Sequence, residues 1–131
     1  MHRFLVLAIS VCLAGLSALA QDPVKVDPKH YKVEFENDQV RVLRISYGPH
    51  EKSIMHEHPA GVAVLLTDNH VKMTLPGGKT KEEQGKAGQA EWAAAEKHQP
   101  ENLGDKPFTL ILVELKTKMA AAKPAPKKPS P

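Results

Sequence analysis

The sequence has 131 residues, a formal net charge of +3 and a single cysteine. A chain of this length holds one domain with short appendages. Residues 21–115 carry 12 Lys and Arg against 15 Asp and Glu, a net charge of −3, so the positive excess belongs to the two ends. A domain that binds nucleic acid needs a basic folded surface, and this charge distribution argues against that class.

The first 20 residues have the pattern of a secretory signal peptide. Arg3 is followed by an apolar run over residues 4–16 and by small residues up to Ala20, an arrangement that signal peptidase cleaves. We therefore predict a signal peptide over residues 1–20, cleavage after Ala20, and a periplasmic or secreted protein without membrane contact after cleavage. The alternative is an uncleaved membrane anchor, for which the apolar run is short.

Cys12, the one cysteine, leaves with this signal peptide. The mature chain would then contain no disulfide and no cysteine nucleophile. Any metal in it would have to be held by nitrogen and oxygen donors.

Residues 21–30 contain two prolines and predict an extended lead-in to a domain over residues 31–116. Within this domain, alternating or β-branched apolar residues between turn residues predict short strands. The predicted strands cover residues 30–36, 40–47, 53–58, 62–66, 71–75 and 108–115, with a charged strand or loop at 79–84. Their spacing of about ten residues is typical of an all-β sandwich or barrel.

The most apolar of these strands carry expectations about burial. Residues 62–66 form a continuous apolar run, which indicates a strand buried on both faces. Residues 108–115 are nearly all apolar, so we expect this strand to lie in the centre of a sheet. In contrast, residues 117–131 are rich in Ala, Pro and Lys, and predict a disordered tail that serves as a spacer or contacts anionic envelope polymers.

Residues 89–97 give conflicting signals. Their composition favours a helix, but Gly88 and Pro100 confine it to little more than two turns, a marginal length for an isolated helix. We predict a strand over residues 89–93 followed by a turn. Trp92, the one tryptophan, is expected in the core.

The His56-Glu57-His58 stretch is the strongest candidate for a functional site. In an extended strand the side chains of His56 and His58 point to the same face, and Glu57 points away. Two imidazoles on one face form half of a metal site. A chance pair of histidines on an exposed edge is the alternative, and His98 is the candidate third ligand that would distinguish the two.

Taken in order, these residues resemble a small single-domain cupin over residues 31–115. The first motif of that family is matched by Gly48 and by His56-Glu57-His58, and the second by Gly85-x-x-Gly88, His98 and Asn102. The resemblance implies an all-β, double-stranded β-helix (a jelly-roll barrel) in which His56, His58 and His98 are the metal ligands. One departure is clear, because Val62 and Ala63 stand where the family has a glutamate ligand.

The resemblance also implies a function. Three imidazoles can hold iron, zinc, copper, nickel or manganese, with Fe(II) the first choice here, and cupins with three histidine ligands include thiol and β-diketone dioxygenases. The predicted function is therefore an exported metal-dependent oxidoreductase, dioxygenase-like, acting on a small anionic molecule. The alternatives are a non-enzymatic module that binds a metal or small ligand, and a degenerate barrel. The resemblance further suggests a homodimer.

Several other residues are weaker candidates. Glu51, Arg44 and Tyr47 are candidate pocket residues that would bind a substrate or approach the metal from the mouth. A solvated turn explains Glu51, and core or edge positions explain Arg44 and Tyr47 equally well. His30 and His70 are expected on the surface.

Overall fold

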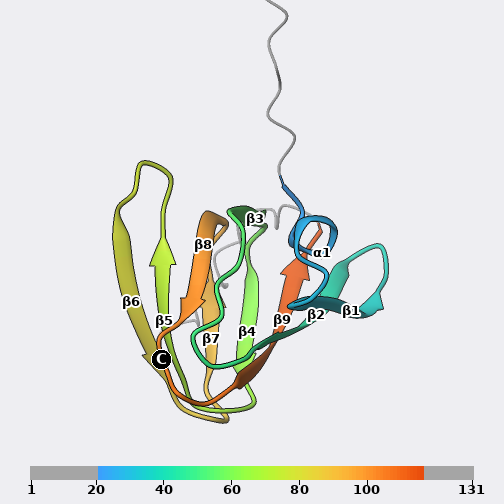
Figure 1. Cartoon of the computed structure of the whole chain (residues 1–131). Coiled ribbons are helices and arrows are strands. Elements are labelled where there is room, and N and C mark those ends of the chain that lie inside the picture. The colour runs from blue at the N-terminus through green and yellow to red at the C-terminus, as the bar shows by residue number, and fades with distance from the viewer. Residues whose placement is uncertain (1–20, 117–131) are drawn as a thin grey trace, which may run out of the picture.

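The computed structural model describes residues 21–116. The predicted signal peptide, Cys12 and the Lys-rich tail lie outside the described residues. The described part is one short helix followed by nine strands in two antiparallel sheets, which confirms the predicted all-β fold (Figure 1). The elements are α1 (Pro23–Val26), β1 (Tyr31–Glu36), β2 (Val40–Tyr47), β3 (His56–His58), β4 (Gly61–Leu65), β5 (Asn69–Thr74), β6 (Thr80–Gly85), β7 (Ala90–Ala93), β8 (Glu96–Asn102) and β9 (Phe108–Leu115).

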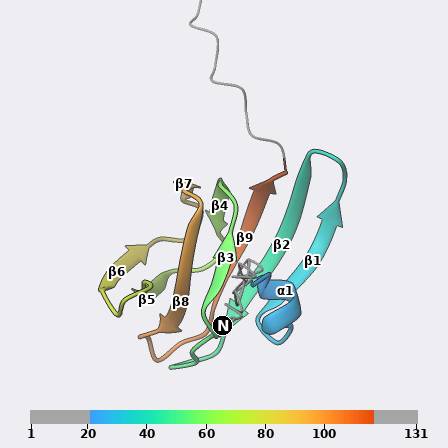
Figure 2. The same cartoon turned by 90° about the horizontal axis from the view of Figure 1, so that it is seen from above.

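The two sheets face each other and enclose the core. The first has the strand order β1-β2-β9-β4-β7 and the second β3-β8-β5-β6. Figure 2 shows β3 and β8 on one side of the space between them and β9 and β2 on the other. The strand at 108–115 is central in its sheet, as predicted, because β9 pairs with both β2 and β4.

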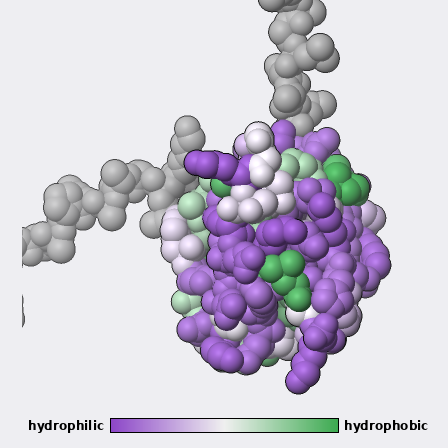
Figure 3. All heavy atoms as spheres, turned by 60° about the vertical axis from the view of Figure 1, so that its left-hand side comes forward, coloured by the Kyte–Doolittle hydropathy of each residue, from purple (hydrophilic) through white to green (hydrophobic). Residues whose placement is uncertain are grey.

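The core consists of side chains that alternate inward from both sheets. Tyr31, Leu43, Ile45, Tyr47, Ala63, Val71, Phe108 and Leu112 form one buried cluster. In contrast, β6 is exposed along most of its length, and the face on its side of the molecule is largely hydrophilic (Figure 3). The second sheet therefore contributes to the core on its inner face and ends in the exposed, polar edge strand β6.

The structure settles the conflict at residues 89–97 in favour of a strand. Ala90–Ala93 form β7, an edge strand paired with β4. The expectation that Trp92 lies in the core was wrong, since 60% of this residue is exposed. The position of β7 explains the difference, because it is an edge strand and its register pairs Trp92 with the half-exposed Val62.

Two further elements differ from expectation. The strand predicted at residues 62–66 is present as β4, but its burial alternates and Val62 is 36% exposed, so it is not buried on both faces. Pro23–Val26 form one helical turn where we expected extended chain, because the Asp22 side chain accepts a hydrogen bond from the Val24 amide and caps the turn. Among the described residues, no helix has the length and apolar character needed to cross a membrane.

Gly61 allows β4 and β9 to lie close together. It is paired with Glu114, and a Cβ atom at Gly61 would overlap the carbonyl oxygen of Val113. We predict that Gly61→Ala lowers the free energy of unfolding by about 1–3 kcal/mol, because the overlap forces the backbones apart. Urea denaturation measures the effect. The neighbouring Val62→Ala, on a half-exposed side chain, should cost about 1 kcal/mol or less; equal losses in the two variants would contradict the close approach.

Candidate metal centre

Strand pairing brings three histidines from two segments together. His56 and His58 lie on β3, two residues apart, and both are buried while Glu57 between them is exposed. β8 runs antiparallel to β3, and the register places His98 directly opposite His56. Side chains that are opposite in a ladder share a face, so all three imidazoles project into the interior.

The three rings form a compact triangle. The ring centroids are separated by 4.9 Å (His56 to His58), 5.1 Å (His56 to His98) and 5.4 Å (His58 to His98). One nitrogen from each ring can be chosen so that all three lie within 4.8 Å of one another. This cluster can hold a metal ion, and it unites the three residues that the motifs singled out.

Each ring uses its Nδ1 atom for a hydrogen bond within the protein. His56 Nδ1 lies 2.7 Å from the carbonyl oxygen of Ile54, and His58 Nδ1 lies 2.6 Å from Oε1 of Glu114. His98 Nδ1 lies 2.8 Å from Oε1 of Glu96. Because carbonyl and carboxylate oxygens accept, these contacts favour the tautomer with a proton on Nδ1 and a lone pair on Nε2.

The Nε2 atom of His56 is buried and has no hydrogen-bond partner among the described residues. An unsatisfied buried polar atom is unusual in a folded protein and costs free energy. A metal ion bound by the three Nε2 lone pairs would satisfy it. The donor set, in which a protein oxygen anchors each Nδ1 and Nε2 is left as the donor atom, is the arrangement typical of metal-bound histidines.

Burial favours the neutral form of two of these rings, His56 and His98. Burial, followed by the neighbouring charge of His58, lowers the pKa of His56 to about 4. Burial also lowers the pKa of His98, although its hydrogen bond to Glu96 opposes the shift. Neutral imidazole is the form that binds a metal, so the site is ready for a cation at neutral pH.

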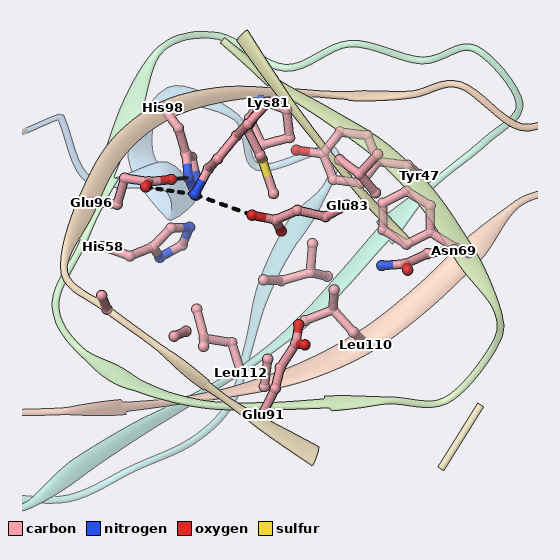
Figure 4. A pocket seen from close by; sticks show the side chains of 18 of the residues that line it. Tyr47, His58, Asn69, Lys81, Glu83, Glu91, Glu96, His98, Leu110 and Leu112 are labelled. Carbon is pink, nitrogen blue, oxygen red and sulfur yellow. Dashed lines mark hydrogen bonds and ion pairs between the residues drawn. The ribbon is translucent and has the colours of Figure 1, made fainter. Parts of the chain in front are cut away.

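A cavity of about 310 Å³ leads to this cluster. Figure 4 shows His58 and His98 together in its wall, with Leu110 and Leu112 beside Glu91. Most of the remaining wall is apolar or aromatic, from Tyr31, Ile45, Tyr47, Ala63, Val71, Met73 and Phe108. A small molecule that entered would therefore be shielded from water on most sides.

The polar part of the cavity lies at the free edges of the two sheets. Lys81 and Glu83 come from β6, and Glu91 comes from β7. Lys81 Nζ lies 3.1 Å from Glu83 and 2.8 Å from Glu96, so it joins β6 to the carboxylate that holds His98 (Figure 4). Of the described residues that line the cavity, Lys81 is the one cation beside three glutamates, so the protein charge around the mouth is acidic.

The three weaker candidates are placed differently. Tyr47 lines the cavity, and its hydroxyl lies 2.6 Å from that of Tyr31. Arg44 does not line it, because this residue points from the outer face of β2 and pairs with Glu34. Glu51 does not line it either, and instead accepts hydrogen bonds from the backbone of its own turn and from a lysine.

His30 was expected on the surface, and this was wrong. Only 5% of it is exposed, and its ring stacks on Tyr47 with centroids 4.2 Å apart. Its Nδ1 lies 2.6 Å from Asp27 and its Nε2 lies 2.8 Å from Glu51. Both nitrogens are used, so His30 is a structural histidine. His70 is half-buried and bonded to Glu82.

The sequence reasoning missed the carboxylates that hold the histidines. Glu114 is 1% exposed and lies on the central strand β9. A signal was available, since Glu114 is the one charged residue in the otherwise apolar or hydroxyl-bearing run of residues 108–115. A charged residue in a central strand needs a partner. The sequence alone did not show that the partner of Glu114 is His58.

Comparisons with known proteins agree with this architecture. No protein-family model matches the sequence. No curated protein matches it. Among solved structures, a cupin domain from Bordetella pertussis Tohama I superimposes with a TM-score of 0.61 at 22% identity, covering 66% of this chain and 92% of that one. A protein with a double-stranded β-helix domain from Klebsiella pneumoniae superimposes with a TM-score of 0.53 at 20% identity, covering 66% and 75%. These similarities show the fold.

The buried neutral histidines predict that the metal-free protein loses stability in acid. The pKa of His56 is about 4 in the folded state and about 6.5 in the unfolded state, so the unfolded chain binds more protons between these values. The free energy of unfolding should therefore fall as the pH drops from about 6.5 to 4, by roughly 3 kcal/mol from this residue. Urea denaturation after chelation, repeated across this pH range, measures the change in the free energy of unfolding. His70→Asn, which removes a half-buried histidine outside the cluster, is the control and should keep the same pH dependence. A flat profile would contradict a buried neutral His56.

Proposed function

We propose that this chain, which has the fold of a small cupin, binds a divalent metal through His56, His58 and His98 and acts as an Fe(II)-dependent enzyme of the dioxygenase type. The observation that carries the proposal is the anchoring of all three Nδ1 atoms, which leaves the Nε2 lone pairs for a metal. A cation there would also satisfy the orphaned Nε2 of His56.

The donor set supports a metal with open positions. Three neutral imidazoles suit iron, zinc, copper and nickel, and they leave sites that a substrate can occupy. Manganese prefers oxygen donors and fits less well. Bound Fe(II) would supply Lewis acidity and the one-electron redox chemistry that dioxygen requires. The protein supplies the binding, the orientation of the rings and the exclusion of water.

The cavity supports a small substrate with an anionic ligating group. Neutral histidines leave the charge of a divalent metal uncompensated, so an anionic group is favoured at the metal. The acidic mouth around Glu83 and Glu91 disfavours a second negative charge there. The substrate class that fits is therefore a compact molecule with its anionic group at the histidines and an apolar body against residues such as Phe108 and Leu112.

The remaining expectations belong to the same proposal. Residues 1–20 would direct the chain to the periplasm or the outside of the cell. After cleavage the mature protein would begin at Gln21. The homodimer suggested by the family resemblance would leave the cavity mouth open if it forms away from β6 and β7.

Metal content tests the ligand set. We predict about one metal ion per purified chain without a histidine tag, and loss of most of it in His98→Ala, because two imidazoles alone hold a metal weakly. Elemental analysis measures stoichiometry, and circular dichroism checks that the variant is folded. His70→Ala, which removes a half-buried histidine bonded to Glu82, should keep full metal content. Retained metal in His98→Ala would remove this residue from the site.

Oxygen consumption tests the reaction. The Fe(II)-loaded protein should consume O2 with small thiols or β-diketones that carry an anionic ligating group, and the zinc-loaded protein should not, because zinc has no redox chemistry. An oxygen electrode measures the rate, with His98→Ala as the inactive control. Reversible metal binding without O2 uptake across such a panel would favour the non-enzymatic binding module.

A further inference from the structure

Glu114 is buried beside the histidine cluster. Only 1% of it is exposed, on the central strand β9. Its Oε1 accepts a hydrogen bond from His58 Nδ1 at 2.6 Å, and its Oε2 accepts one from Arg41 Nε at 2.6 Å. Both oxygens are thus engaged on the outer side of the His58 ring, and Glu114 is not itself placed as a ligand.

Arg41 is held in turn by the start of the described chain. Its guanidinium donates to the two carboxylate oxygens of Asp22 at 2.8 and 3.3 Å, and Asp22 caps α1. A line of charge-assisted hydrogen bonds therefore runs from Asp22 through Arg41 and Glu114 to His58. Such bonds are stronger than neutral ones and fix geometry, so the carboxylate of Glu114 has little freedom to turn away.

These two contacts define what Glu114 does at His58. Arg41 Nε donates to Oε2 and holds the carboxyl group in place, while Oε1 accepts from His58 Nδ1. A carboxylate that accepts from Nδ1 fixes the tautomer and ring orientation of a histidine and increases the electron density at its Nε2.

We propose that Glu114 is the positioning residue of the metal centre: from β9 it orients His58 and strengthens its Nε2 as a donor to the metal. The inference rests on the metal binding proposed above. Glu114 lies outside both sequence motifs, and its effect on metal affinity is exerted through His58.

Glu96 offers a built-in comparison. It holds His98 Nδ1 at 2.8 Å and is itself held by Lys81, so a cation, a carboxylate and a histidine are connected here as well. However, the Glu96 and Lys81 side chains are 28% and 42% exposed, whereas that of Glu114 is 2% exposed. Solvent weakens such contacts, so the effect of Glu96 on metal affinity should be smaller than that of Glu114.

The test compares three conservative substitutions at carboxylates bonded to histidine. Glu114→Gln and Glu96→Gln act at the site, and Glu82→Gln acts at the remote, more exposed pair with His70. Zinc affinity is measured by competition with a chromogenic chelator, and the Co²⁺-substituted proteins are compared by visible absorption. Thermal unfolding of the metal-free proteins monitors the fold.

We expect Glu114→Gln to lower zinc affinity about 10- to 100-fold and to alter the Co²⁺ spectrum. Glu96→Gln should lower affinity less, and Glu82→Gln should leave affinity and spectrum unchanged. If Glu114→Gln does not fold, Glu114→Asp replaces it, since this variant keeps the negative charge near Arg41 but lacks the length to reach His58 and should lose affinity similarly.

Two results overturn the inference in distinguishable ways. A folded Glu114 variant with wild-type affinity and an unchanged Co²⁺ spectrum would make Glu114 a structural residue and leave the metal site intact. Failure of the wild-type protein to bind either Zn²⁺ or Co²⁺ would overturn the proposed function, and this inference with it.

Discussion

The register between β3 and β8 is the constraint on which the site depends. His98 joins the other two histidines because it lies directly opposite His56, and a shift of one residue would turn it to the other face of the sheet. Contacts beyond the short β3 strand hold the register. The Ser53 amide donates to the Pro100 carbonyl, the Asn102 amide donates to the Glu51 carbonyl, and the Gln99 side chain donates to the Ser53 carbonyl.

This register places three imidazoles in the interior, where burying their polar nitrogen atoms costs free energy. Buried polar groups need partners, and residues 21–116 provide one for each Nδ1 but none for the Nε2 of His56. The missing hydrogen bond at this atom lowers the stability of the folded, metal-free chain. A bound cation would reverse it, because a ligand that binds only the folded state stabilises that state. The geometry of the site and the stability of the domain are therefore linked.

The spacing of residues in the sequence was sufficient to predict an all-β fold, and the resemblance to cupins added the set of three histidines. Alternation placed His56 and His58 on one face, and the order of the two motifs indicated His98. The faces of individual strands were harder to predict. Trp92 was expected inside because it is large and apolar, but β7 is an edge strand and Trp92 is paired there with the half-exposed Val62. His30 was expected outside, because local sequence does not show that Asp27 and Glu51 surround it.

Glu114 lay beyond prediction for a different reason, and its position has a consequence for the chemistry. It belongs to β9 in one sheet and holds His58 on β3 in the other, so the contact exists only after the two sheets meet. A carboxylate that ligates a metal directly cancels one unit of its charge. A carboxylate behind the histidine leaves that charge facing the cavity while still strengthening the donor. With the proposed metal bound, the site would combine firm attachment of the cation with a strong attraction of that cation for an anionic ligand.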